Sequence, residues 1–71
     1  MTCLSFEATT EKLHRERGEF PVVRVTMEDG NMLDYYVGPR SWSLLQTTDT
    51  GSGLISCPIA SGPIRTSGRD A

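Results

Sequence analysis

Apolar and polar residues alternate in two arms of the chain that meet at Asp29 and Gly30. The apolar positions of the two arms are Val23, Val25, Met27, Leu33, Tyr35 and Val37. A period of two predicts two strands, each with one buried face. The Asp-Gly pair favours the positive backbone dihedrals of a tight hairpin turn, because glycine has no side chain to clash there. We therefore expect a β-hairpin over residues 20–37.

A short helix is predicted before this hairpin. Thr9 or Thr10 is suited to cap its amino end, and Gly18 is suited to close its carboxyl end. Its apolar content is small: Leu13, joined by Phe6 if the helix reaches back that far. We therefore expect this helix to lie on the surface of the domain.

Short strands separated by turns are expected after the hairpin. The sequence predicts a break at 38–40, a third strand at 41–48, a turn at 49–53, a fourth strand at 54–59 and a very short fifth strand through Ile64. Pro58 interrupts the fourth strand and indicates an edge or a bend. This order predicts a mostly β fold with a short N-terminal helix, built as a strongly bent five-stranded antiparallel sheet or small open barrel.

The chain length allows one domain with a marginal core. A chain of 71 residues buries only about 60% of the surface that its unfolded form exposes, so a partner or oligomerisation is expected to help. The domain is expected over residues 9–65, and the tail 66–71 is expected to be disordered. Residues 1–8 keep two interpretations open, a paired strand or an extension of the helix.

Charge and cysteine content narrow the class of protein. The net charge of −2 and pI near 5.2 argue against a whole surface built to hold nucleic acid. The apolar runs fall short of the roughly 20 residues that cross a bilayer, and the first residues do not resemble a secretory signal, so we expect a cytoplasmic protein. For Cys3 and Cys57, free thiols are favoured over a disulfide.

The sequence offers no constellation of residues for catalysis. His14 lies in the charged run KLHRER, without an apolar pocket to tune it, and Cys3 and Cys57 lie far from it in sequence, without the paired spacing of metal ligands. We therefore expect no enzyme, no cofactor and no metal site. Two features suggest binding instead: the basic cluster His14, Arg15 and Arg17, whose alternative is an ordinary solvated helix face, and Trp42, whose alternative is packing.

The segment LHRERGEFPVVRVTMEDGNMLDYYV resembles the Hfq-like branch of the Sm-like (LSm) family. In that family, a helix ending in a basic patch leads through a proline into a strand, an Asn-Gly or Asp-Gly turn and a second strand. The HRER run at residues 14–17 is similar to the family's Arg-Arg-Glu-Arg rim motif, and WSLL and ISCPIAS are similar to its later strands. The resemblance is divergent and spans residues 12–65.

The resemblance implies a bent five-stranded sheet capped by the helix, with subunits joined edge to edge into a ring. The ring would be a hexamer or another assembly of five to seven subunits, binding single-stranded, A/U-rich RNA in post-transcriptional regulation. The rim role would fall to His14, Arg15 and Arg17, and the role of stacking a uridine base would fall to Trp42.

This sequence departs from the family pattern at the second motif. The family's Lys-His pair falls on Ser56 and Cys57, which removes charge and hydrogen-bond donors from the usual uridine pocket. The competing hypothesis is a small β-barrel that binds a protein, as an inhibitor or assembly factor such as a phage would carry, without any role in nucleic-acid binding. The acidic balance and the exposed edge expected near Pro58 support this hypothesis.

Overall fold

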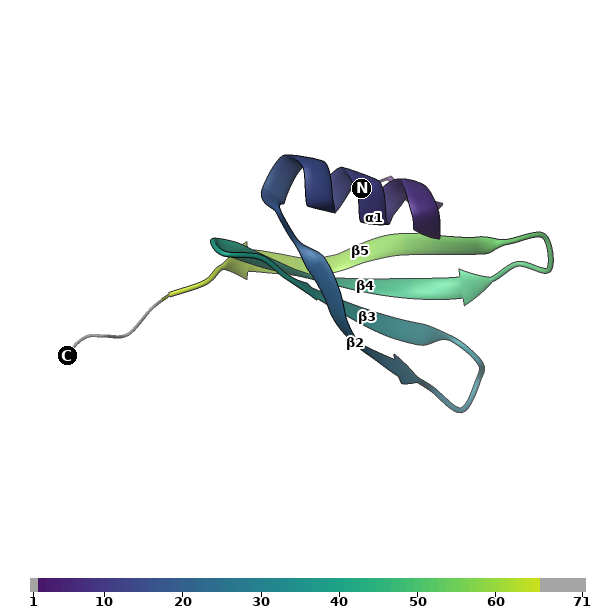
Figure 1. The fold of residues 1–71 in the computed structure, drawn as a ribbon. Coiled ribbons are helices and arrows are strands. Elements are labelled where there is room, and N and C mark those ends of the chain that lie inside the picture. The colour runs from purple at the N-terminus through teal and green to yellow at the C-terminus, as the bar shows by residue number, and fades with distance from the viewer. Residues whose placement is uncertain (1, 66–71) are drawn as a thin grey trace.

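The computed structural model describes residues 2–65 and contains one helix and five strands in that range (Figure 1). The elements, in chain order, are β1 (Leu4–Ser5), α1 (Phe6–Arg17), β2 (Phe20–Thr26), β3 (Met32–Val37), β4 (Ser41–Asp49) and β5 (Leu54–Pro63). The expectation of a mostly β fold with a short N-terminal helix is confirmed. The predicted disorder of 66–71 lies outside the described residues.

All five strands join one antiparallel sheet in the order β1-β5-β4-β3-β2. The sheet is open: β1 and β2 form opposite edges and do not pair with each other. Helix α1 lies across one side of this sheet (Figure 1). We call that side the helix-covered face and the opposite side the outer face.

The separate fifth strand predicted at Ile64 is wrong. Strand β5 continues through Pro58 as far as Pro63, and the pairing of β4 with β5 shifts register between Leu44 and Leu45. This β-bulge lets one long strand absorb the proline. The fifth strand of the sheet is instead β1, which pairs Leu4 with Ser56 at the other end of the chain.

The helix begins earlier than the threonine pair suggested. Ser5 is the N-cap, and its side-chain oxygen accepts a hydrogen bond from the Ala8 amide at 3.1 Å. Each of the two interpretations of residues 1–8 holds for part of the segment: its described residues are divided between strand β1 and the first turn of α1. The predicted carboxyl end is confirmed: Gly18 has φ 66°, and its amide donates to the His14 carbonyl.

The hairpin between β2 and β3 is confirmed, but its turn needs only one positive φ. The Gly30 amide donates to the Met27 carbonyl at 3.0 Å, and the Met27 amide donates to the Asn31 carbonyl at 2.7 Å. Gly30 has φ 90°, and no residue other than glycine has a positive φ among those described. This pattern is that of a three-residue hairpin loop, whose last residue takes the left-handed conformation.

Burial on the sheet is opposite to the predicted apolar pattern. Eight of the described residues are buried, and six of these are polar or charged: Thr9, Glu19, Asp34, Ser43, Thr47 and Ser56, with Tyr36 and Leu45 as the two others. Asp34 and Tyr36 of β3 point to the helix-covered face, whereas their apolar neighbours Leu33 and Tyr35 are only half-buried. The expectation that the apolar side of each hairpin strand is buried is therefore wrong.

The expectation of free thiols is also wrong, because Cys3 and Cys57 form a disulfide. Pairing of Leu4 with Ser56 sets the next residues, Cys3 and Cys57, opposite each other, with their Cα atoms 4.3 Å apart. The bond connects positions 54 residues apart in sequence and fastens β1, and with it the start of α1, to β5. Sequence spacing alone did not show that these two cysteines meet.

Candidate interaction surfaces

The predicted site residues fall on two separate parts of the molecule. His14, Arg15 and Arg17 lie in the last turn of α1 and are exposed. Trp42 lies on β4, where its neighbour Ser43 is buried on the helix-covered face. Because side chains alternate along a strand, Trp42 points to the outer face. The structure therefore does not bring Trp42 together with the basic cluster.

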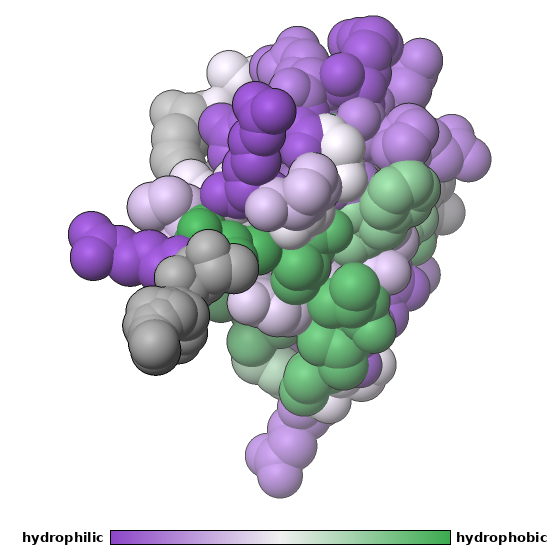
Figure 2. Space-filling view, turned by 60° about the vertical axis from the view of Figure 1, so that its left-hand side comes forward, coloured by the Kyte–Doolittle hydropathy of each residue, from purple (hydrophilic) through white to green (hydrophobic). Residues whose placement is uncertain are grey.

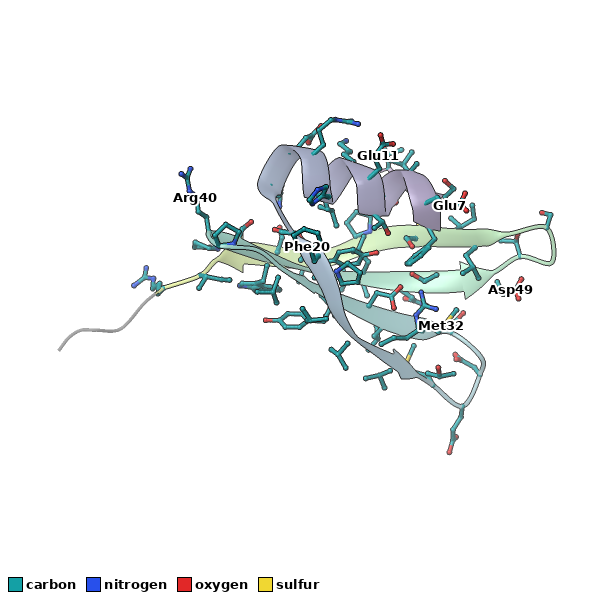
Figure 3. All side chains as sticks on the ribbon, in the orientation of Figure 1. Glu7, Glu11, Phe20, Met32, Arg40 and Asp49 are labelled. Carbon is teal, nitrogen blue, oxygen red and sulfur yellow. A yellow bond between two sulfur atoms is a disulfide. The ribbon has the colours of Figure 1, made fainter. Side chains whose placement is uncertain are left out.

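Two of the three basic residues already have protein neighbours. Arg15 forms an ion pair with Glu11 at 3.3 Å, and the exposed fractions of these side chains are 62% and 73%. Figure 3 shows Glu11 pointing away from the sheet. The His14 ring lies against Phe20, with 4.4 Å between ring centroids. An exposed ion pair such as that of Arg15 with Glu11 contributes little to stability.

Arg40 joins this basic region from another part of the chain. It lies in the turn between β3 and β4 and lines a shallow depression together with Arg17 and Ser41. Figure 3 shows Arg40 pointing outward at the end of the sheet near the end of α1. Gly38 permits this approach, because a Cβ there would lie 3.0 Å from the Arg17 and Gly18 carbonyl oxygens. Arg40 lies more than 20 residues from Arg17 in the sequence, so its approach to the cluster is not visible in the sequence pattern.

Trp42 is held by packing on the outer face. A Cβ added at Gly62 would lie 3.2 Å from the Trp42 ring. The absence of a side chain at Gly62 therefore leaves room for the ring to pack over β5. Tyr35 lies beside it, with ring centroids 6.2 Å apart and planes tilted by 43°. The ring is half-buried. This environment is that of an aromatic pair on a sheet surface.

The outer face carries seven large apolar side chains of β2, β3 and β4. Its members are Val23, Val25, Leu33, Tyr35, Val37, Trp42 and Leu44. Figure 2 shows hydrophilic atoms gathered over the upper part of the molecule, where α1 lies, and hydrophobic atoms gathered below them. Among residues 2–65, no element covers this face. On this face Val23 and Val25 are exposed, and the other members are half-buried.

Strand β2 is the most exposed element of the sheet. All seven of its residues are exposed, and Phe20, Val22, Val23 and Val25 are each more than half exposed. It pairs with β3 on one side, and within the described part of the chain nothing pairs with its other side. The edge therefore presents unpaired backbone groups beside exposed apolar side chains.

The backbone groups at this edge follow from the hairpin register. Antiparallel ladders alternate between residues that bond inward and residues whose amide and carbonyl point outward. The Met27 amide bonds to the Asn31 carbonyl. By alternation from that pair, the backbone amides of Val25 and Val23 point toward β3. The amides of Arg24 and Thr26 point to the open edge. These two donors are the positions at which a new strand would dock.

A polar network under the helix fixes the orientation of β2. The Arg24 guanidinium donates to Asp34 through Nε at 2.6 Å and through a terminal nitrogen at 3.1 Å. Thr47 donates to the same carboxylate at 2.7 Å, and Ser56 and Thr47 share a hydrogen bond of 2.7 Å. The Arg24 guanidinium also lies 4.9 Å from the Phe6 ring centroid.

This network shifts the pKa of its carboxylate. Burial raises the pKa of Asp34. Hydrogen bonds from Arg24 and Thr47 lower it, and together with the charge of Arg24 they outweigh burial, so the pKa of this carboxyl lies below its ordinary value. The sequence contained a signal for this pair: the hairpin register sets Arg24 directly opposite Asp34, and opposite charges at such positions attract. The alternation of apolar residues alone does not indicate this pair.

A second buried polar contact joins the helix to the sheet. The Thr10 hydroxyl donates to the Phe6 carbonyl at 2.9 Å, so the Tyr36 hydroxyl donates in turn to Thr10 at 2.7 Å. Burial raises the pKa of Tyr36, and the contact with Thr10 offsets only part of that rise. Beside this contact, the Thr9 and Ser43 hydroxyls are buried without hydrogen-bond partners.

A hollow of about 260 Å³ lies between α1 and the sheet. Leu13 and Leu45 line it together with Thr9 and Ser43. Within residues 2–65, His, Cys, Asp and Glu side chains do not gather in threes or more in a way that would hold a metal ion. No helix in that range has both the length and the apolar character needed to cross a membrane.

Comparison of the chain with models of known protein families, with curated proteins and with solved structures gives no match. The fold and its surfaces define the class to which the chain is assigned: a small open antiparallel sheet with one face covered by a helix, and with an apolar outer face and an unpaired edge.

Proposed function

We propose that this chain is a protein-interaction module that takes up a partner strand at the open edge of β2. The proposal rests on one observation: β2 is a seven-residue strand that is exposed throughout, and no strand among residues 2–65 pairs with its outer side. Strand addition to such an edge supplies main-chain hydrogen bonds, and neighbouring side chains supply specificity. The apolar outer face continues the same surface.

The middle of this edge lacks the usual protection against pairing. Proteins protect sheet edges with charges, prolines, bulges or covering elements. In β2 these features are concentrated at the start, at Pro21 and at the register shift before Val23. The strand's one charged residue, Arg24, is held by Asp34. Residues 23–26 are thus left open, as a binding edge requires.

Substitution of Thr26 by proline tests this proposal. Because the Thr26 amide points away from β3, the proline removes a donor from the open edge and leaves the β2–β3 ladder in place. Tagged wild-type chain, treated with nuclease, should retain a stoichiometric protein partner, either an untagged second copy or another protein, and Thr26→Pro should lose it. Equal recovery by both chains would contradict the role of β2.

A second candidate is the Sm-like function that the sequence resemblance implies. In that proposal, the chain forms a ring of five to seven subunits and binds single-stranded, A/U-rich RNA. The observation in its favour is that Arg17 and Arg40 line one depression, together with Glu16, at the end of α1 that also carries His14 and Arg15. Phosphate contacts from such a cluster give binding that weakens with salt.

Fluorescence anisotropy with an A/U-rich RNA oligonucleotide separates the two candidates. RNA binding through the cluster predicts that Arg17→Ala with Arg40→Ala lowers affinity at least tenfold and reduces the salt dependence. Binding that is equal in wild type and in this double variant, or absent at low salt, would remove the RNA candidate. Neither outcome would affect the test of β2.

A further inference from the structure

We infer that the partner of β2 is β2 of a second copy of this chain. The two strands would pair antiparallel about a two-fold axis and join the two sheets into one continuous sheet of two chains. This inference rests on the proposed function, because it names the partner taken up at the same edge. It differs from the head-to-tail ring, in which β2 of one copy would pair with the opposite edge of the next.

The opposite edge of the sheet is poorly suited to pairing. Strand β1 already covers the first part of β5, through the pairs of Leu4 with Ser56 and Ser5 with Ile55. Beyond that point, β5 contains Pro58 and Pro63, which have no amide to donate.

The ladder register shows which way these prolines point. The Ile64 amide donates to the Arg40 carbonyl, so the neighbouring Pro63 directs its nitrogen away from β4. Pro58 is opposite Leu45. The Thr50 amide donates to the Gly53 carbonyl in the turn, and inward and outward residues alternate along the ladder from that bond. By this alternation the Pro58 nitrogen also points away from β4. The outer edge of β5 therefore lacks donors at two positions of its uncovered part.

The edge of β2 is compatible with a copy of itself. Arg24, the one ionisable residue of the strand, is already neutralised by Asp34, so two apposed copies do not place uncompensated like charges across the junction. A two-fold axis perpendicular to the sheet keeps both outer faces on one side. Val23 and Val25 of both copies would then form a continuous apolar stripe across the junction.

The two-fold arrangement pairs the β2 edge of each copy with the β2 edge of the other, so it ends at two chains. An isologous junction is self-limiting, whereas a head-to-tail junction generates rings or filaments. The hollow does not obstruct it, because its lining residues belong to β1, β4, β5 and α1 and not to β2. The geometry thus favours a dimer.

Two proline substitutions, one at each edge, form a matched test by light scattering over a range of protein concentrations. Thr26→Pro removes an outward amide from β2, and Ser61→Pro removes one from β5, since Ser61 pairs with Ser43 two positions along from Pro63. We expect wild type and Ser61→Pro to approach twice the chain mass of 7.8 kDa as concentration rises. Thr26→Pro should remain at the mass of a single chain.

A wild-type mass of five to seven chains, or loss of assembly in Ser61→Pro but not in Thr26→Pro, would overturn the two-fold junction. Circular dichroism and melting of each variant show whether it retains the fold. A monomeric wild type that still captures a different protein through β2 would contradict the pairing with a second copy and would support the proposed interaction module. A monomeric wild type without β2-dependent capture would overturn both.

Discussion

The two faces of the sheet differ in what they bury and in what they expose. The helix-covered face buries a polar network centred on Asp34, with Tyr36 and Leu45 as its apolar content. The outer face carries valines, leucines, Tyr35 and Trp42, and no element among residues 2–65 covers it. The comparison indicates that the polar face determines the internal fold of the single chain, whereas the apolar face and edge are available for association.

The disulfide is expected to contribute most to the internal fold of the single chain. It connects β1, which leads directly into α1, to β5. A cross-link between residues 54 apart is expected to stabilise the folded chain by about 4 kcal/mol through loss of unfolded-state entropy. Cys3→Ser with Cys57→Ser should lower the free energy of unfolding by that amount in urea titrations.

Wild type treated with a dithiol reductant is the control for the serine variant, since it removes the same bond without changing the sequence. The two should unfold at the same urea concentration. Unchanged stability in both would mean that the bond does not restrain the fold.

A matched pair of truncations compares the two faces directly. Leu45 is 1% exposed on the helix-covered face, whereas Val25 is 53% exposed on the outer face. Leu45→Ala should cost about 3 kcal/mol of unfolding free energy, because it leaves a cavity. Val25→Ala should stay within about 0.5 kcal/mol in dilute monomer. Equal losses would show that the outer face is covered within the single chain.

Removing the charge of Asp34 tests the polar network. Asp34→Asn takes a charged partner from Arg24, whose side chain is 38% exposed and regains some water. The expected cost is therefore about 2 to 3 kcal/mol, below the range for a fully buried pair. Glu28→Gln, at an exposed position in the hairpin turn, should change stability by less than about 0.5 kcal/mol.

The same network predicts an acid dependence. The pKa of Asp34 is lower in the folded chain than in the unfolded chain. Its contribution is therefore complete above the unfolded pKa of about 3.9 and is lost as pH falls through the lower folded value. Urea titrations from pH 7 to pH 2 should show a fall in wild type that is smaller in Asp34→Asn. Parallel curves would contradict the shifted pKa.

The smallest expected effect is a gain in stability. The Thr9 hydroxyl is buried without a partner, whereas the Thr47 hydroxyl bonds to Asp34 and Ser56. Thr9→Val should raise the free energy of unfolding by about 1 kcal/mol, and Thr47→Val should lower it by at least that amount. Ser43→Ala should act as Thr9→Val does. A loss in both Thr9→Val and Ser43→Ala would show that these hydroxyls have partners.

Local signals in the sequence predicted the local elements well. The hairpin around Gly30, the helix end at Gly18, the break at 38–40 and the turn at 49–53 all depend on residues close together in sequence, and all are present. The ion pair of Glu11 with Arg15 likewise follows from their spacing of four.

The faces of the strands were harder to predict, because periodicity does not say which side a helix will cover. Leu33, Tyr35 and Val37 are the more apolar set, yet Asp34 and Tyr36 are buried, since Arg24 and Thr10 satisfy their polar atoms. The disulfide depended on a pairing between opposite ends of the chain, which sequence spacing does not reveal. The approach of Arg40 to Arg17 likewise arises only from the folded turns.

Amide hydrogen exchange along β2, measured by NMR at low and high protein concentration, tests the central claim most directly. In dilute protein, the Val23 and Val25 amides should exchange slowly, because they bond to β3, and the Arg24 and Thr26 amides should exchange fast. At high concentration all four should be slow, as the outer edge becomes paired. Slow exchange of Arg24 and Thr26 in dilute monomer, or fast exchange at every concentration, would contradict an open edge that another strand fills.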